Sequence, residues 1–181
     1  VEVPLDEARI GLFADLLRDR HDGMTVGRSV DYLRARLLDR PQANFRAVVY
    51  RSQAGKGVDS FALLRDYAAP DGRRVVHLED YWTRSTQRRS LAKLLAEISL
   101  MSFAEQRHVL RCFALQDAPL EAALAAGRWR RKHEVHLMML PINETLQPVL
   151  RPGIKVDLRG ADVSLYPPTG LALQPTLASR P

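Results

Sequence analysis

The sequence predicts one α/β (α+β) domain: a mixed, mostly antiparallel sheet flanked by helices, followed by an irregular proline-rich tail. Three strand-like segments follow one another with short turns, which is typical of an antiparallel meander. A long amphipathic segment then leads into another strand, and such a crossover indicates a parallel pair. Regular patterning stops near position 141, so we expect a domain over residues 1–141 and an extension over residues 142–181.

Two amphipathic helices are expected near the start of the chain, after a short strand. Over residues 6–20 the apolar side chains recur at helical spacing, and the Asp-Gly pair at positions 22–23 ends the segment. A second helix is predicted from about residue 30 to residue 38. Pro41 stops it, because the residue before a proline avoids the helical region.

The three strands of the meander come next. They are predicted over residues 45–50, 58–67 and 74–82. The turn segments between them contain glycines, which favour tight connections.

A long helix follows, with Ser85 or Thr86 as its expected N-cap and apolar residues at helical spacing up to Phe103. It leads into an apolar strand over residues 108–115. This strand is expected to pair in parallel with the strand over residues 74–82.

A short helix over residues 119–126 and a final strand over residues 133–140 complete the predicted domain. Pro119 suits the first turn of this helix, and Gly127 suits the C-cap position. Beyond residue 141 the chain has many prolines and little periodicity. We expect this tail to wrap the surface or to contact a partner, such as a second copy or an upstream domain.

Composition excludes several classes of protein. A chain of 181 residues can bury roughly 70% of the surface that its unfolded form exposes, so neither disulfides nor a structural metal is required. Cys112 is the single cysteine and cannot form an internal bridge. No stretch of 18 apolar residues and no signal peptide are present, so we expect a cytoplasmic protein without a membrane span or metal.

The net charge of +6 and the isoelectric point near 9.9 first suggest nucleic acid as a partner. Arginines are frequent along the whole chain, and basic residues are concentrated in only two short clusters, at positions 84–89 and 128–132. Clusters this short fit a small polyanion, and the chain has no nucleic-acid recognition motif. Nucleic acid is therefore not the expected partner.

The start of the long helix carries the segment Gln87-Arg88-Arg89-Ser90-Leu91-Ala92. Together with the order of elements, it resembles the GNAT superfamily of acyl-CoA-dependent N-acyltransferases, whose motif is Gln/Arg-x-x-Gly-x-Gly/Ala. Ser90 replaces one glycine, so the chain resembles a divergent member over residues 1–141. The resemblance implies a sheet with a central parallel wedge, and acetyl-CoA or a related acyl-CoA as co-substrate.

Anion binding at a helix N-terminus is the physical basis of this motif. The first turn exposes unpaired N–H groups, and small residues such as Ser90 and Ala92 let a pyrophosphate approach them. The Ser90 hydroxyl is a further candidate donor, and Arg84, Arg88 and Arg89 would supply positive charge. In the alternative interpretation, Arg88 and Arg89 are simply solvated on an exposed turn. We favour pyrophosphate binding, because these arginines cluster at this one helix start.

The strand before the motif ends in Leu78-Glu79-Asp80-Tyr81-Trp82. The resemblance implies that it bulges here, splays from its parallel neighbour and pairs through its backbone with the pantetheine arm. The implied cofactor-binding residues are Tyr81, Trp82, Thr83, Gln87, Arg88, Arg89, Ser90, Leu91 and Ala92.

The resemblance also implies a carboxylate near the bulge that deprotonates the attacking amine. Glu79 and Asp80 are the candidates. Consecutive strand residues point to opposite faces, so at most one of the two is expected to face the substrate, and we favour Asp80. In the alternative interpretation, the carboxylate pairs with an arginine of a neighbouring element and is structural.

The general acid is the clearest departure from the family pattern. Many members have a tyrosine four residues before the glycine that matches Gly127, and this chain has Ala123 there. Tyr67, Tyr81, Ser90 and Cys112 are candidate replacements. Cys112 is nevertheless expected to be a buried, inert thiol, and His77 an interior residue rather than a base.

The resemblance therefore implies a bacterial N-acyltransferase that moves an acyl group, acetyl first among them, to an amine by direct attack in a ternary complex. An amino sugar is one candidate acceptor. The alternative is a catalytically degenerate GNAT-like domain that binds CoA or a protein partner as a sensor or interaction module.

Overall fold

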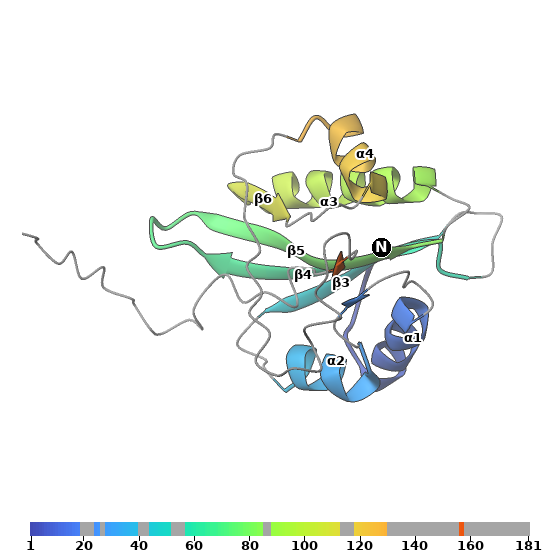
Figure 1. The fold of residues 1–181 in the computed structure, drawn as a ribbon. Coiled ribbons are helices and arrows are strands. Elements are labelled where there is room, and N and C mark those ends of the chain that lie inside the picture. Colours follow the sequence, from blue (N-terminus) through green and yellow to red (C-terminus); the bar gives the residue numbers. More distant parts are fainter. Residues whose placement is uncertain are drawn as a thin grey trace, which may run out of the picture.

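The computed structural model of the chain describes residues 1–18, 24–25, 28–39, 44–51, 57–84, 88–112, 118–129 and 156–157. Its helices and strands, in chain order, are β1 (Glu2–Val3), α1 (Glu7–Arg18), β2 (Met24–Thr25), α2 (Val30–Leu37), β3 (Phe45–Tyr50), β4 (Ser60–Ala68), β5 (Arg74–Thr83), α3 (Arg88–Ala104), β6 (Val109–Cys112), α4 (Ala118–Ala126) and β7 (Val156–Asp157). Five strands form one sheet in the order β1-β3-β4-β5-β6. Helices α1 and α2 cover one face, and α3 and α4 cover the other (Figure 1).

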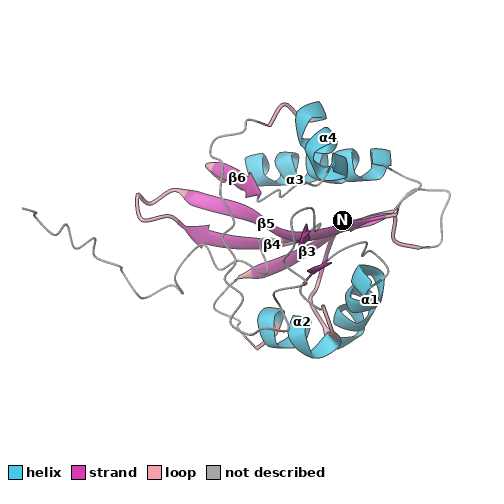
Figure 2. Cartoon of the chain, viewed as in Figure 1, coloured by secondary structure: helices cyan, strands magenta, loops and turns pink. Residues whose placement is uncertain are grey.

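The centre of the sheet is an antiparallel meander, as predicted. Strand β3 pairs with β4 from Phe45↔Arg65 to Tyr50↔Ser60, and β4 pairs with β5 along nearly its whole length. Strand β6 joins the other edge of β5 in parallel after the crossover through α3, from Val75↔Val109 to Leu78↔Cys112. The predicted mixed, mostly antiparallel sheet between helices is therefore confirmed (Figure 2).

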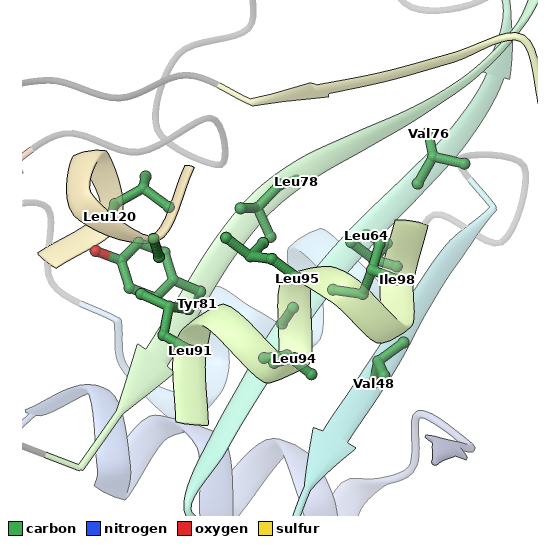
Figure 3. Packing of buried hydrophobic residues seen from close by; sticks show 12 residues of the cluster. Val48, Leu64, Val76, Leu78, Tyr81, Leu91, Leu94, Leu95, Ile98 and Leu120 are labelled. Carbon is green, nitrogen blue, oxygen red and sulfur yellow. The ribbon is translucent and has the colours of Figure 1, made fainter. Parts of the chain in front are cut away.

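The side of the sheet under α3 and α4 holds one hydrophobic core. Apolar side chains of α3 pack on alternate residues of the three central strands, and Leu120 of α4 closes the end near Tyr81 (Figure 3). The buried members are Val48, Ala62, Leu64, Val76, Leu78, Tyr81, Leu91, Leu94, Leu95, Ile98, Leu120 and Ala123. Period-two alternation places the members from β3, β4 and the first part of β5 on a single face of the sheet.

A second core lies under α1 and α2, on the opposite face. Phe13 of α1 stacks on Phe61 of β4 with ring centroids 4.3 Å apart, and Phe61 stacks in turn on Trp82 of β5 at 6.3 Å. Stacked aromatic pairs of this kind stabilise a core beyond the area that they bury. The row of rings connects α1 to the last residues of β5.

Ion pairs tie the outer strands to the end of α3. The guanidinium of Arg46 on β3 contacts Glu2 at 3.2 Å, Asp66 at 3.2 Å and Glu105 at 2.8 Å. Arg107 contacts the same Asp66 and Glu105 carboxylates. Because these partners come from four separate segments, the network fixes β1, β3 and β4 relative to the C-terminal end of α3.

The predicted helices and strands that lie within the described residues are confirmed, with small shifts at their ends. The expected N-cap at Ser85 or Thr86 and the expected strand over residues 133–140 lie outside the described residues. From the tail, Val156 and Asp157 form β7, which pairs in parallel with Met24 and Thr25 of β2. This part of the tail returns to the segment between α1 and α2.

The end of α4 depends on Gly127, which occupies the predicted C-cap position. Arg128, with φ of 56°, is the left-handed residue that follows, and the N–H groups of Arg128 and Trp129 bond to the carbonyls of Ala125 and Leu124. This is the Schellman pattern. A Cβ on Gly127 would lie 3.0 Å from Cδ1 of Trp129, so the glycine permits the indole to fold back onto the helix.

Two glycine substitutions test this reading of the helices. Gly127→Ala should destabilise the protein by about 1 kcal/mol or more, because the new methyl group displaces Trp129 from its packing. Gly11→Ala in the interior of α1 should stabilise it by about 0.5–1 kcal/mol, since a Cβ there meets nothing within 4 Å. Urea unfolding of both variants measures the difference. Equal effects of the two substitutions would contradict the proposed role of Gly127.

Candidate active site

A β-bulge interrupts β5 where the sequence places its two carboxylates. Leu63 of β4 pairs with Asp80, and the next residue, Leu64, pairs with Leu78, so Glu79 is the extra residue. A bulge disturbs the regular alternation of side chains. Leu78 and Tyr81 accordingly both belong to the core under α3.

The expectation that Glu79 and Asp80 point to opposite faces is therefore wrong. Asp80 contacts Arg28, which precedes Ser29, the N-cap of α2, and Glu79 contacts Arg36 within α2. Both carboxylates thus lie on the side of the sheet that α1 and α2 cover. The reason is the extra residue in the bulge, which no periodicity argument includes.

Asp80 is held on both carboxylate oxygens. Oδ2 accepts a 2.6 Å hydrogen bond from Nε of Arg28, and Oδ1 accepts one of 2.8 Å from the N–H of Tyr81. The side chains of Asp80 and Arg28 are only 1% and 2% exposed. These contacts match the second sequence interpretation, in which the carboxylate pairs with an arginine of a neighbouring element. They join the bulge to the start of α2.

Glu79 is equally buried but held differently. Its Oε1 lies 2.6 Å from Nε of Arg65 on β4, and its Oε2 lies 3.7 Å from Nη2 of Arg36. Burial, together with the neighbouring charge of Asp80, raises the pKa of Glu79 against the opposite effect of the Arg65 and Arg36 guanidinium groups. A carboxyl group with a raised pKa takes up a proton closer to neutral pH, which is what a general base requires.

His77 lies beside Glu79 on the same side of β5, with Nδ1 3.6 Å from Oε1. Its partners in the neighbouring strands are Arg65 and Arg111. Burial, followed by the charges of these two arginines, lowers the pKa of His77 to about 4. The imidazole is therefore neutral near pH 7, and its 4% exposure confirms the predicted interior position.

Residues 79–83 of β5, which we call the β5 edge, extend beyond the parallel pair. The pairing with β6 ends at Leu78↔Cys112, whereas β5 continues to Thr83 with β4 alone as its recorded strand partner among the described residues. Tyr81 turns its ring into the core under α3 and α4 (Figure 3), and Trp82 packs on the opposite face. This matches the position at which the resemblance places the wedge.

Ser90, in the first turn of α3, uses its hydroxyl within the protein. Its Oγ lies 3.1 Å from Oγ1 of Thr83 and donates to the carbonyl of Asp59 at 3.5 Å, while Ser60 donates to the carbonyl of Ser90. The side chain is only 3% exposed. The expectation of Ser90 as a hydroxyl donor to phosphate is not supported by this geometry, because the hydroxyl points toward the sheet.

The other residues of the predicted motif have separate roles. Leu91 belongs to the core, and Ala92 packs against it. Arg89 is exposed on the first turn, whereas the guanidinium of Arg84 reaches back to the carbonyl of Val58 at 3.3 Å. Gln87 and the side chain of Arg88 lie outside the described part of the chain.

The candidate general acids give no clear replacement for tyrosine. Ala123 is buried among the core residues of α4. Burial raises the pKa of Cys112 to about 11, so it stays a thiol near neutral pH, as expected of an inert cysteine.

No group of three or more His, Cys, Asp or Glu side chains in the described part of the chain is arranged to hold a metal ion. Likewise, no described helix has the length and apolar character needed to span a bilayer.

Arg28, Arg36 and Arg65 were not singled out from the sequence. Arg65 did carry a signal, because a charged residue within the apolar strand Phe61-Ala-Leu-Leu-Arg65 requires a buried partner. Arg28 and Arg36 carried none, since arginines next to or within a short amphipathic helix are ordinarily solvated.

Comparison with solved structures identifies the fold. A ribosomal-protein-alanine N-acetyltransferase from Brucella melitensis biovar Abortus 2308 is 16% identical with a TM-score of 0.55, over 77% of this chain and 99% of that one. An aminoglycoside acetyltransferase from an uncultured soil metagenomic sample, in complex with sisomicin, is 14% identical with a TM-score of 0.54, over 78% and 95%. A transcriptional regulator from Bacillus halodurans C-125 is 16% identical with a TM-score of 0.58, over 77% and 99%.

Neither a protein-family model nor a curated protein matches the sequence. The structural likeness nevertheless defines the class: the chain has an acetyltransferase fold. More particularly, it is the GNAT fold in a divergent form, as the element order and the motif at residues 87–92 predicted.

The buried His77 predicts a specific pH dependence of stability. The unfolded chain takes up a proton as the pH falls from 6.5 toward about 4, whereas the folded protein does not, so folding is destabilised over this window. The full effect is on the order of 3 kcal/mol. His77→Asn should remove this loss, as measured by urea unfolding at several pH values in this range. The raised pKa of Glu79 changes stability in the opposite direction, but it does so equally in the wild type and the variant. If the difference in unfolding free energy between the two proteins stays constant across this pH range, the assignment to His77 is contradicted.

Proposed function

We propose that the chain is an N-acyltransferase that transfers an acyl group, acetyl first among them, from an acyl-CoA to an amine by direct attack in a ternary complex. The observation that carries this proposal is the course of β5. It leaves its parallel neighbour at Leu78, bulges at two carboxylates and continues to Thr83, five residues before α3 begins at Arg88. The likeness in fold to acetyltransferases supports the same reading.

In the proposed complex, the pantetheine arm pairs with the backbone of Tyr81, Trp82 and Thr83 as an added strand. The pyrophosphate binds at the N–H groups in the first turn of α3, where Arg88 and Arg89 supply charge. The remaining motif residues, Gln87, Ser90, Leu91 and Ala92, form or support this turn. The bond from Ser90 to Thr83 would hold the turn against the β5 edge.

For the reaction, the amine nitrogen attacks the thioester carbonyl, and its proton passes to a base directly or through water. Collapse of the tetrahedral intermediate breaks the C–S bond, and the thiolate takes a proton from water. We propose Glu79 as the base, since its pKa is raised by burial, and Asp80 as the residue that positions the bulge. Water is proposed as the acid because Ala123 stands where the family tyrosine is expected.

A second candidate function has a specific observation in its favour. Ala123 offers no acidic group, and a neighbour of similar fold is a transcriptional regulator. A domain that binds CoA or a protein partner without turnover would share the fold and lack the acid. Calorimetry with acetyl-CoA, followed by a thiol-release assay over a panel of amines and amino sugars, separates the two. Binding without turnover supports the CoA sensor, and no binding rejects both the transferase and the CoA sensor.

Removal of charge at the start of α3 tests the cofactor site. Arg88→Ala with Arg89→Ala should weaken acetyl-CoA binding by about tenfold or more in calorimetry, because charge-assisted contacts to phosphate are lost. The matched control is Arg18→Ala with Arg73→Ala, which removes the same charge from exposed positions on α1 and the β4–β5 turn. If both double variants lose the same acetyl-CoA affinity, the effect comes from net charge and not from a site at the start of α3.

The two carboxylates should respond differently to neutralisation. Glu79→Gln should lower kcat at least about tenfold with little effect on the Kd of acetyl-CoA, since a general base contributes a factor of about 100 or more. Asp80→Asn should instead destabilise the fold by about 3 kcal/mol, because it leaves the buried Arg28 without a charged partner. Full activity in Glu79→Gln would return the role of base to Asp80 or to water.

A further inference from the structure

The side of β5 that faces α2 carries an unusual concentration of buried charge. Arg28 and Asp80 neutralise each other through their 2.6 Å hydrogen bond. Glu79 is then the carboxylate that two further guanidinium groups share, one at each oxygen: Arg65 at 2.6 Å and Arg36 at 3.7 Å. Within the described residues, this cluster of Glu79, Arg36 and Arg65 therefore holds more positive than negative charge.

The geometry of the cluster is incomplete as well as unbalanced. Among the described residues, the Glu79 oxygens and the Nε atoms of Arg36 and Arg65 make no hydrogen bond of good geometry, although both arginines lie close to the carboxylate. The contact between Arg65 and Glu79 is close but not aligned as a hydrogen bond. Buried polar groups are normally satisfied, because an unmade hydrogen bond costs the desolvation of that group. The cluster thus has unused capacity for both a donor and an acceptor.

His77 borders the same cluster and is affected by its charge. It lies next to Glu79, and its neighbours in β4 and β6 are the arginines at positions 65 and 111. After burial, these two charges are the causes that disfavour its protonated form. Two guanidinium groups therefore lie beside this imidazole as well as beside the Glu79 carboxylate.

We propose that the amine acceptor of the acyl transfer carries an anionic group, a carboxylate or a phosphate, which binds Arg36 and Arg65 while its amine approaches Glu79. This inference rests on the proposed function. Each arginine side chain is 17% exposed and can be reached, and a guanidinium binds either anion through paired N–H groups. The anion would balance the surplus charge, and the amine would supply the donor that the Glu79 oxygens lack.

The proposal has a mechanistic consequence for the base. An acceptor anion competes with Glu79 for the two guanidinium groups, so its binding weakens the interactions that favour the ionised carboxylate. The affinity of Glu79 for a proton rises at the moment when the amine must lose one. Binding of a correct acceptor would thus prepare the base, whereas a neutral amine would leave Glu79 paired with the arginines.

Matched acceptors test the proposal directly. Thiol release from acetyl-CoA is measured for glycine against glycinamide, β-alanine against its amide, and phosphoethanolamine against ethanolamine. We expect the anionic member of at least one pair to have a kcat/KM about tenfold or more higher, and the first two pairs against the third distinguish carboxylate from phosphate. Equal or better turnover of the neutral members would overturn the proposal.

Substitutions in the cluster test whether its arginines cause the preference for anionic acceptors. Arg36→Gln should raise the KM of the anionic acceptor and remove most of its advantage, with an unchanged Kd for acetyl-CoA, and Arg36→Lys should restore part of it. Arg34→Gln is the matched control, because Arg34 lies on the same helix, is exposed and pairs with Glu7. A preference that persists in Arg36→Gln and in Arg65→Gln would overturn the assignment to these residues.

A direct binding measurement separates failure of this proposal from failure of the proposed function. Succinate or inorganic phosphate is titrated at constant ionic strength while the imidazole of His77 is followed by NMR. A bound anion should raise the pKa of His77 from about 4, and Arg36→Gln should suppress the response. A response without acetyl-CoA binding rejects the transferase and keeps the anion site. Turnover without anion response or anion preference keeps the transferase and rejects the site.

Discussion

The buried ion pair between Arg28 and Asp80 is the interaction on which the rest of the site depends. Both side chains are almost fully buried, so each neutralises the charge of the other. A buried charge without its partner would destabilise the fold by several kcal/mol. The second oxygen of Asp80 accepts the N–H of Tyr81, so the same carboxylate fixes the backbone of the bulge. Asp80 thus connects the start of α2 to the bulge of β5 and to the backbone of Tyr81 that follows it.

The bulge lies where β5 contributes large aromatic side chains to the cores on both faces of the sheet. Beyond it, Tyr81 enters the core under α3 and α4, and Trp82 joins the row of rings under α1. Both ends of the proposed cofactor path are thereby anchored in packed cores, and Ser90 connects the first turn of α3 to Thr83 between them. A rigid strand edge beside a rigid helix start is what a ligand with an extended arm and a pyrophosphate requires. The acceptor side is built differently, from charged groups rather than from packing.

Much of the fold could be predicted because its signals are local. The apolar run in residues 45–50, the glycine turns and the long apolar stripe that ends near Phe103 each predict an element without reference to distant residues. The crossover through α3 then required the parallel pair of β5 and β6. At the candidate site, the sequence predicted a strand that carries both carboxylates and a long helix after it, yet it misjudged the faces of Glu79 and Asp80. A bulge depends on how two strands pair, and the alternation within one strand does not show where an extra residue will be accommodated.

The sequence by itself determined the order of elements, the amphipathic faces, the small residues at the start of α3 and the absence of a tyrosine at position 123. Only the tertiary structure decided which arginines meet which carboxylates. Arg36 and Arg65 lie 29 residues apart and converge on Glu79 because α2 packs across the face of the sheet where β4 carries its one inward guanidinium. A sequence gives the net charge of the chain. The effect of each charge on a pKa or on a bound ligand depends on burial and distance, which only the folded chain defines.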